Sequence, residues 1–174
     1  GGVYLCAGAE AGMTDSKIEN NSAENNGGGL YLECGAALKV TNKLTVSSNT
    51  ATQGGGLYIG GGTDGTCVHA LGNEYSITGN TATQGGGVYF ACLGSMTLDG
   101  TTLTNNSADL GGAICAAAGT TVFKSADTQG CSAATGGSAL YIMKDATFDH
   151  ASGTLAGSAY AEGTYKLNAA DATV

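Results

Sequence analysis

The chain has 174 residues, with 31 glycines, 6 cysteines and no proline. Only 11% of its residues are charged, and 14 acidic against 6 basic side chains give a formal net charge of −8. This composition argues against a nucleic-acid partner, because neutralising phosphates requires clusters of basic residues. A transmembrane helix is not expected either, since the sequence lacks the run of about 18 apolar residues that a span needs.

One phrase recurs along the chain: a glycine pair or triplet followed by an aliphatic residue. In chain order the aliphatic position falls at residues 3, 30, 57, 88, 114 and 140. The next residue is Cys115 in one phrase and tyrosine in the others, namely Tyr4, Tyr31, Tyr58, Tyr89 and Tyr141. A fixed spacing of about 20 to 50 residues is typical of stacked repeat architectures.

A second motif lies between the glycine phrases. It is an aliphatic residue followed two or three positions later by an asparagine, and it ends at Asn21, Asn49, Asn80 and Asn106. A third apolar run precedes it, as at residues 38–40 and 96–98. The repeat therefore holds three runs of alternating apolar residues separated by Gly, Asn, Thr and Ser, a pattern typical of three short strands.

These repeats predict an all-β fold. A unit of roughly 27 residues cannot bury its own apolar face, so its neighbours must cover it. Stacked coils place parallel strands about 4.8 Å apart, and right-handed winding is the default for parallel connections. We therefore predict a right-handed parallel β-helix of about six coils, with three short strands per coil.

We assign the β-helix repeats to residues 1–157. Residues 158–174 lack a full glycine phrase, and we expect an irregular last coil or a C-terminal arm there. The chain also begins inside a repeat phrase, so we expect it to be a piece of something longer.

The corner residues have a structural interpretation. Sharp corners require positive φ, which glycine adopts freely and asparagine tolerates. Asparagines at the same corner of successive coils can also bond amide to amide along the stack, which satisfies buried polar groups. We expect a structural ladder at Asn21, Asn49, Asn80 and Asn106.

The two motifs together resemble a known family. Gly-Gly-Ala-Ile at residues 111–114, combined with Ile-Thr-Gly-Asn at 77–80 and its equivalents, is similar to the paired phrases of chlamydial polymorphic outer membrane protein repeats and related bacterial β-helix passengers. The resemblance covers about residues 1 to 142, with an aliphatic residue in place of the family's phenylalanine. It implies an autotransporter passenger at the cell surface that acts in adhesion and self-association.

The cysteine content fits an oxidising compartment. Cys6 and Cys34 occupy neighbouring coils and are the favoured disulfide pair, with Cys67–Cys92 and Cys115–Cys131 as further candidates. Six cysteines permit fifteen pairings, and stacked thiols without disulfides are the alternative. Close C-x-x-C pairs are missing, so we expect neither a metal site nor a cofactor.

The candidate binding feature is the tyrosine column formed by Tyr4, Tyr31, Tyr58, Tyr89 and Tyr141. Alternation points these side chains outward, where an exposed aromatic ladder could stack on sugar rings or join solenoids side by side. The alternative is that the rings only stabilise one sheet face through mutual contacts. The insertion at residues 60–67 is a second place where a partner could bind, or a loop fastened by Cys67.

Catalysis is not expected. Hydrolases need two carboxylates across a sugar bond, about 5 to 9 Å apart. Asp145 with Asp149, or Asp99 with Asp127, could be fitted to that role, but the sequence around them shows no insertion that would build a cleft. The two histidines, His69 and His150, are expected in solvated loops.

The sequence thus predicts a non-enzymatic extracellular or cell-surface β-solenoid with a structural or adhesive function. Self-association along the helix axis is the expected interaction, because open solenoid ends present unpaired backbone groups and apolar side chains. Host or matrix glycans and surface proteins are further candidate partners. The competing hypothesis is a β-helix that binds or cleaves carbohydrate.

Overall fold

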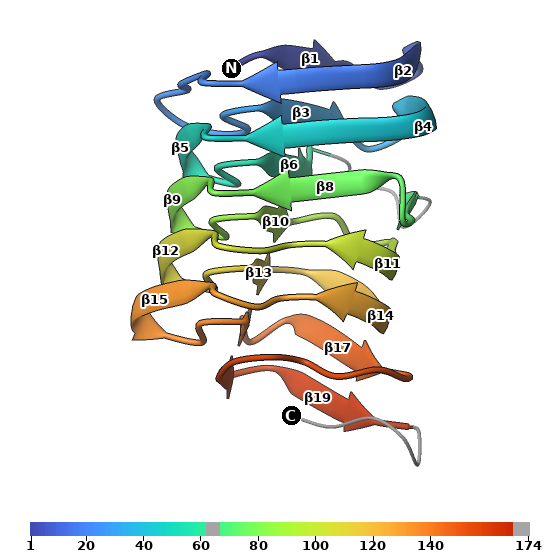
Figure 1. Ribbon diagram of the computed structural model, residues 1–174. Helices are drawn as coiled ribbons and strands as arrows, with labels where there is room; N and C mark the ends of the chain where they lie inside the picture. The colour runs from blue at the N-terminus through green and yellow to red at the C-terminus, as the bar shows by residue number, and fades with distance from the viewer. Residues whose placement is uncertain (62–66, 169–174) are drawn as a thin grey trace.

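The structure is a computed structural model, which describes residues 1–61 and 67–168. In these ranges the chain forms 19 β-strands and no helix. The strands pair in parallel and build three sheets, named A, B and C here. Figure 1 shows the strands of successive coils stacked above one another from the N-terminus to the C-terminus.

Sheet A contains seven strands, and each of the first six begins at the aliphatic residue of a glycine phrase. Its strands in order are β1 (Val3–Leu5), β3 (Leu30–Glu33), β6 (Leu57–Gly60), β10 (Val88–Phe90), β13 (Ile114–Ala116), β16 (Leu140–Ile142) and β18 (Ala159–Ala161). Their register places the aliphatic residues directly opposite one another, as in Val3 with Leu30 and Val88 with Ile114.

Sheets B and C form the other sides of each coil. Sheet B contains β2 (Glu10–Glu19), β4 (Ala37–Ser47), β7 (Val68–Leu71), β8 (Tyr75–Thr78), β11 (Ser95–Thr102), β14 (Gly119–Asp127), β17 (Ala146–His150) and β19 (Thr164–Leu167). Sheet C contains β5 (Thr50–Gln53), β9 (Thr81–Gln84), β12 (Ser107–Leu110) and β15 (Ser132–Gly136).

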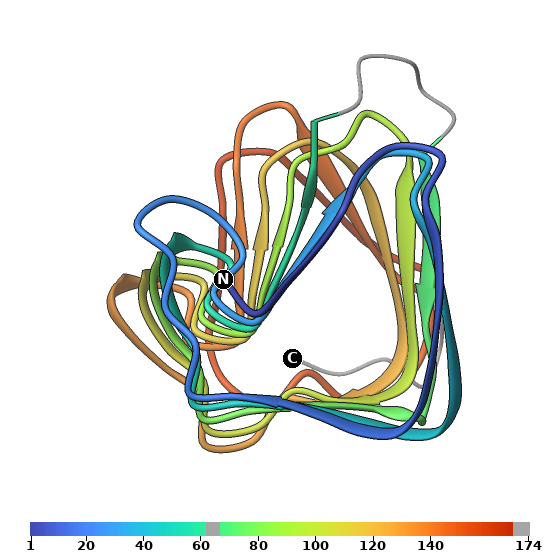
Figure 2. The ribbon, with the colours of Figure 1, turned by 90° about the horizontal axis from the view of Figure 1, so that it is seen from above.

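The coil winds to the right. Seen from above in Figure 2, the chain runs clockwise while it descends from the N-terminus, away from the viewer. Figure 1 agrees, because β2 points to the left in front while β1 points to the right behind it. The predicted right-handed parallel β-helix with three sheets is therefore confirmed.

Long strands of sheet B bend around a corner of the solenoid. In β2 and β4 the bend falls at Asp15 and Asn42, whose φ angles of 45° and 65° lie in the left-handed region. The register between the two strands shifts at the same place. The Nδ2 of Asn42 donates a 2.9 Å hydrogen bond to the Asp15 carboxylate, so side chains of adjacent coils hold the corner together.

Sheet B is interrupted next to the insertion at residues 60–67. On one side β4 pairs with β2 along its whole length. On the other side its second half, residues 44–47, pairs with β8, whereas β7 pairs with β11. A cavity of about 230 Å³ lies at this interruption, lined by residues that include Leu32, Ala36, His69 and Tyr75. The insertion thus separates two coils locally while the rest of the stack stays continuous.

The core is a column of aliphatic and aromatic side chains inside the coils. Alternation along sheet A sends Leu30 and Leu32 inward, and both are fully buried, as are Val88 and Phe90. Full burial of each such side chain contributes roughly 1.5–3 kcal/mol relative to exposure. Hydrophobic stacking along the axis is therefore what holds the coils on one another.

The final segment continues two of the sheets. Within residues 158–168, β18 pairs with β16 and β19 pairs with β17, both in register. Tyr160 lies opposite Tyr141, and Tyr165 lies opposite Phe148. The end of the expected C-terminal arm, residues 169–174, lies outside the described residues.

Candidate functional site

Four asparagines form a ladder inside one corner of the solenoid. The Nδ2 of Asn21 donates to the Oδ1 of Asn49, that of Asn49 to Asn80, and that of Asn80 to Asn106, each over 3.0 Å. Each Oδ1 also accepts the backbone N–H of the preceding asparagine at 2.9 Å. Asn49, Asn80 and Asn106 are completely buried, so these bonds satisfy polar groups that water cannot reach.

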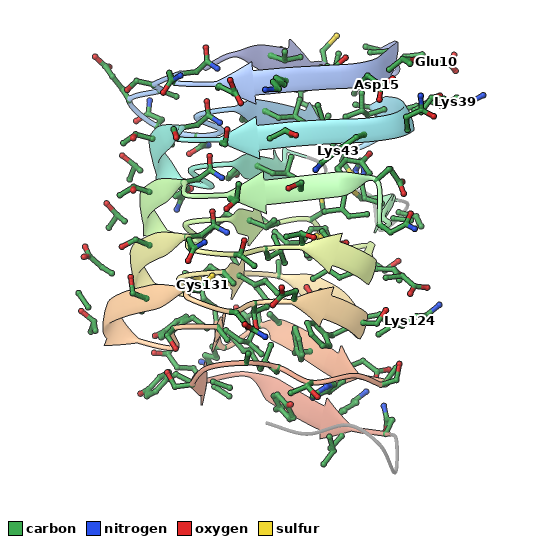
Figure 3. All side chains as sticks on the ribbon, viewed as in Figure 1. Glu10, Asp15, Lys39, Lys43, Lys124 and Cys131 are labelled. Atoms are coloured by element: carbon green, nitrogen blue, oxygen red, sulfur yellow. The ribbon has the colours of Figure 1, made fainter. Side chains whose placement is uncertain are left out.

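The ladder continues toward the C-terminal coils with a different residue. Cys131 lies beneath Asn106, where its Sγ accepts the backbone N–H of Asn106 at 3.4 Å. The same thiol donates to the carbonyl of Leu103 at 2.9 Å. Figure 3 shows Cys131 within the body of the stack, between the strands.

Positive φ occurs one residue before the ladder, not on it. Asn20, Ser48 and Asn105 have φ angles of 58°, 55° and 56°, while the asparagines that follow them do not fall in this region. The expectation that the ladder asparagines themselves turn the corner is therefore wrong. The preceding residue makes the turn, which points the following amide along the stack.

Glycines of the phrase make room for the ladder. A Cβ at Gly56 would lie 2.9 Å from the Nδ2 of Asn80, and one at Gly87 would lie 3.0 Å from the Nδ2 of Asn106. These separations are too short for a methyl group beside a packed amide. The glycine phrase of one coil and the ladder asparagine of the next coil thus form one corner.

The tyrosines form a column on the outer face of sheet A. Ring centroids lie 4.8 Å apart between Tyr4 and Tyr31, 4.7 Å between Tyr31 and Tyr58, and 5.5 Å between Tyr58 and Tyr89. Cys115 replaces the next ring. The column then resumes with Tyr141 and Tyr160 at 5.2 Å, so the structure adds a member that the glycine phrase did not reveal.

The column is not the exposed ladder that the sequence suggested. Tyr58, Tyr89 and Tyr141 are 8%, 6% and 7% exposed, and they form a second hydrophobic cluster with Cys115. Figure 2 shows that the chain folds back between sheets C and A, so that the two sheets meet beside the outer face of sheet A. Gln53 from sheet C donates to the hydroxyl of Tyr89 at 3.2 Å.

The ends of the column remain open to solvent. Tyr4 is 57% exposed and Tyr160 is 51% exposed. Near each end a carboxylate accepts a hydrogen bond from a tyrosine hydroxyl. Tyr4 donates to Glu33, and Tyr141 donates to Glu162 at 2.6 Å. These hydrogen bonds raise the pKa of Tyr4 and of Tyr141 to about 12, and the bond from Tyr4 lowers the pKa of Glu33.

The structure contains no disulfide among the six cysteines, all of which lie within the described residues. Cys6 is exposed, whereas its predicted partner Cys34 is buried in the core. Cys115 belongs to the tyrosine column and Cys131 to the asparagine ladder. The remaining predicted pair, Cys67 and Cys92, has its Sγ atoms 2.7 Å apart. The disulfide assignments therefore stay predictions.

The histidines are not in solvated loops, contrary to expectation. His69 lies in β7 and is 9% exposed, and His150 lies in β17 and is fully buried. Burial lowers the pKa of His69 because its charged form is desolvated. The Nδ1 of His150 lies 2.5 Å from the hydroxyl of Tyr165, and its Nε2 lies 3.1 Å from the carbonyl of Gly153. Alternation along sheet B explains both positions.

The carboxylates considered for catalysis occupy surface positions. Asp99 pairs with Lys124 at 3.6 Å, with both side chains about half exposed. Asp149 accepts a hydrogen bond from the side chain of Asn168. Figure 3 shows Lys124 projecting from the edge of the stack, as Glu10 and Lys39 do. The inserted loop, the other candidate, falls mostly on residues 62–66, outside the described residues.

These features define a class: a right-handed parallel β-solenoid with an internal asparagine ladder and an outer tyrosine column. The model of the Chlamydia polymorphic membrane protein repeat matches this chain at residues 15–33 and at residues 100–117. Each match spans one ladder asparagine and the glycine phrase that follows it. The resemblance found in the sequence is therefore confirmed for these two repeats.

No curated protein matches the chain, and no solved structure does either. In the described residues no helix is both long enough and apolar enough to cross a membrane. The fold and the matched repeats fit a structural protein of the surface-passenger kind.

Proposed function

We propose that this chain is an extracellular structural β-solenoid that associates with further copies of itself, end to end along its axis. Support for the extracellular location comes from the matched surface-protein repeat and the scarcity of charged residues. Support for axial association comes from the two ends of the described stack. The proposal gives the protein a scaffolding role at a surface.

The observation that carries the proposal is that the first and last strands of sheet A could pair with each other between two molecules. Within the described residues, β1 and β18 are the edge strands of this sheet, and each has a sheet neighbour on one side. Such edges readily accept another strand. All pairs in sheet A are parallel and in register, so β18 of one molecule can continue onto β1 of the next with Tyr160 opposite Tyr4.

The side chains at these edges favour the same contact. Tyr4 and Tyr160 expose about half of their surface, although the middle rings of their column are buried. In the first coil Val3 and Leu5 are partly buried, whereas their neighbours Leu30 and Leu32 are fully buried. A further coil would cover this apolar surface. The contact is head to tail, which generates linear assemblies.

Sedimentation velocity over a concentration series tests this proposal with Tyr160→Lys. We expect the weight-average mass of the wild-type chain to rise with concentration and that of Tyr160→Lys to stay at the monomer value. Leu93→Lys is the matched control, because Leu93 is 61% exposed but lies between β10 and β11, away from both ends. Equal association of the wild-type chain and Tyr160→Lys would refute the proposed contact.

We propose the structural role in preference to carbohydrate binding or cleavage. A sugar-binding platform needs exposed rings, and the middle of the tyrosine column is buried against sheet C. Asp99, one of the carboxylates considered, forms an ion pair with Lys124. Retention on immobilised glycans that is lost in Tyr4→Ala, or turnover of an acidic polysaccharide, would favour the carbohydrate function.

A further inference from the structure

Three cysteines converge in the core, next to the interruption of sheet B. The Sγ atoms of Cys34, Cys67 and Cys92 all lie within 4.8 Å of one another, and all three side chains are buried. The Sγ atoms of Cys67 and Cys92 approach to 2.7 Å. The cluster draws its members from three successive coils, so chain folding alone brings them together.

The three cysteines of the cluster do not all occupy the same position in the repeat. Cys34 and Cys92 both lie four residues after the aliphatic residue of their glycine phrases, and the two following coils have Ala118 and Lys144 at that distance. Cys67 has a different place in the repeat. Val68 pairs with Ser95, which puts Cys67 opposite Gly94, beyond the insertion. The insertion therefore directs a third thiol between two equivalent ones.

We propose that Cys34, Cys67 and Cys92 form a three-sulfur binding site for a soft monovalent metal ion, Cu(I). Thiolates select soft ions, of which Cu(I) and Zn²⁺ are the common ones. A metal–sulfur distance of about 2.3 Å in a trigonal site places the sulfurs about 4.0 Å apart. The cluster meets this requirement once Cys67 and Cys92 separate by about 1.3 Å.

The cluster lies within the hydrophobic core of the stack. Burial raises the pKa of Cys67, and its hydrogen bonds with Cys34 and Cys92 act in the same direction. Binding of Cu(I) releases the thiol protons to solvent and leaves the oxidation states of sulfur and copper unchanged.

The number of ligands favours Cu(I) over Zn²⁺. Structural zinc sites are almost always four-coordinate, whereas three cysteines make up the cluster in the described residues. His69, two residues after Cys67, has a buried Nε2 without a hydrogen-bond partner in the described structure, but it does not belong to the cluster of ligand atoms. His69 lines the cavity of about 230 Å³ at the interruption.

The test is a titration of the reduced 174-residue chain with Cu(I), supplied as its acetonitrile salt without oxygen and in competition with bicinchoninate. We expect one copper per chain and an X-ray absorption spectrum with three sulfur ligands. Cys67→Ala should weaken binding at least 100-fold, and Cys34→Ser should do so too if Cys67→Ala fails to fold. Cys115→Ala is the control, because Cys115 is equally buried outside the cluster.

Three results would overturn the proposal. They are binding of less than half an equivalent by the reduced chain, equal affinity in the wild-type chain and Cys67→Ala, and tighter binding of Zn²⁺ that depends on His69. Oxidation of the chain by glutathione disulfide provides a further check. It removes two electrons and two protons from Cys67 and Cys92, which join as a disulfide while glutathione is reduced, and it should abolish copper binding.

Discussion

Asn80→Ala is the sharpest test of the asparagine ladder. The Oδ1 of Asn80 accepts the backbone N–H of Asn49 at 2.9 Å and the Nδ2 of Asn49 at 3.0 Å. Its own Nδ2 donates to the carbonyl of Val46 at 2.9 Å and to Asn106 at 3.0 Å. Alanine removes all four bonds in a place that is fully buried.

The size of the effect follows from what is left unpaired. The backbone N–H of Asn49 loses its Oδ1 partner, and a buried unsatisfied donor costs about 1–3 kcal/mol. The three other bonds contribute roughly 0.5–1.5 kcal/mol each. We therefore expect Asn80→Ala to lower the free energy of unfolding by about 4 kcal/mol.

Equilibrium urea unfolding followed by circular dichroism measures this difference. Asn73→Ala is the control, because Asn73 is exposed, and surface substitutions usually change stability by less than about 0.5 kcal/mol. Asn21→Ala, at the end of the ladder, should cost about 1 kcal/mol. If Asn80→Ala were no more destabilising than Asn21→Ala, the buried bonds of the ladder would not stabilise the stack.

Three further predictions concern the corner glycines, the ladder's end and the buried tyrosines. Gly56→Ala should destabilise the folded chain by about 2 kcal/mol, since its Cβ would lie 2.6 Å from the Cγ2 of Ile77. Gly12→Ala is the control and should be neutral in the same urea assay, because there is open space around its Cβ. Equal effects of the two substitutions would contradict the packing argument. Cys131→Asn should extend the ladder only together with Ala113→Gly, because Ala113 occupies the position at which other coils have a glycine beside the asparagine. A double-mutant cycle should give a favourable coupling energy of about 1–2 kcal/mol. Additive effects of the two substitutions would refute this prediction. Burial raises the pKa of Tyr75 and Tyr89 to about 12 from the ordinary value of 10, so the folded chain holds these protons more tightly and its stability should fall as pH rises from 10 to 12. Absorbance of tyrosinate should rise together with loss of circular dichroism in that range, and ionisation of all tyrosines near pH 10 without unfolding would contradict it.

The fold could be predicted from the sequence because its repeats are short and regular. The glycine phrase fixed the register of sheet A, since its aliphatic residues lie opposite one another in the structure. The asparagine motif likewise pointed to the corner where the ladder forms. Period-two alternation correctly separated the inward aliphatics from the outward tyrosines.

The missed features depend on how distant segments meet. The burial of Tyr58 and Tyr89 arises from the angle between sheets A and C, which alternation within one strand does not encode. The cysteine cluster escaped a search for close C-x-x-C pairs because its three members come from successive coils. Cys67 in addition follows an insertion, which shifts its place in the repeat.

Negative-stain electron microscopy of the purified chain across a concentration series tests the central claim most directly. Axial association predicts unbranched particles one solenoid wide whose length grows with concentration, and that growth should be absent in Tyr160→Lys. Single short particles at every concentration, in both the wild-type chain and the variant, would contradict the account of a self-associating solenoid.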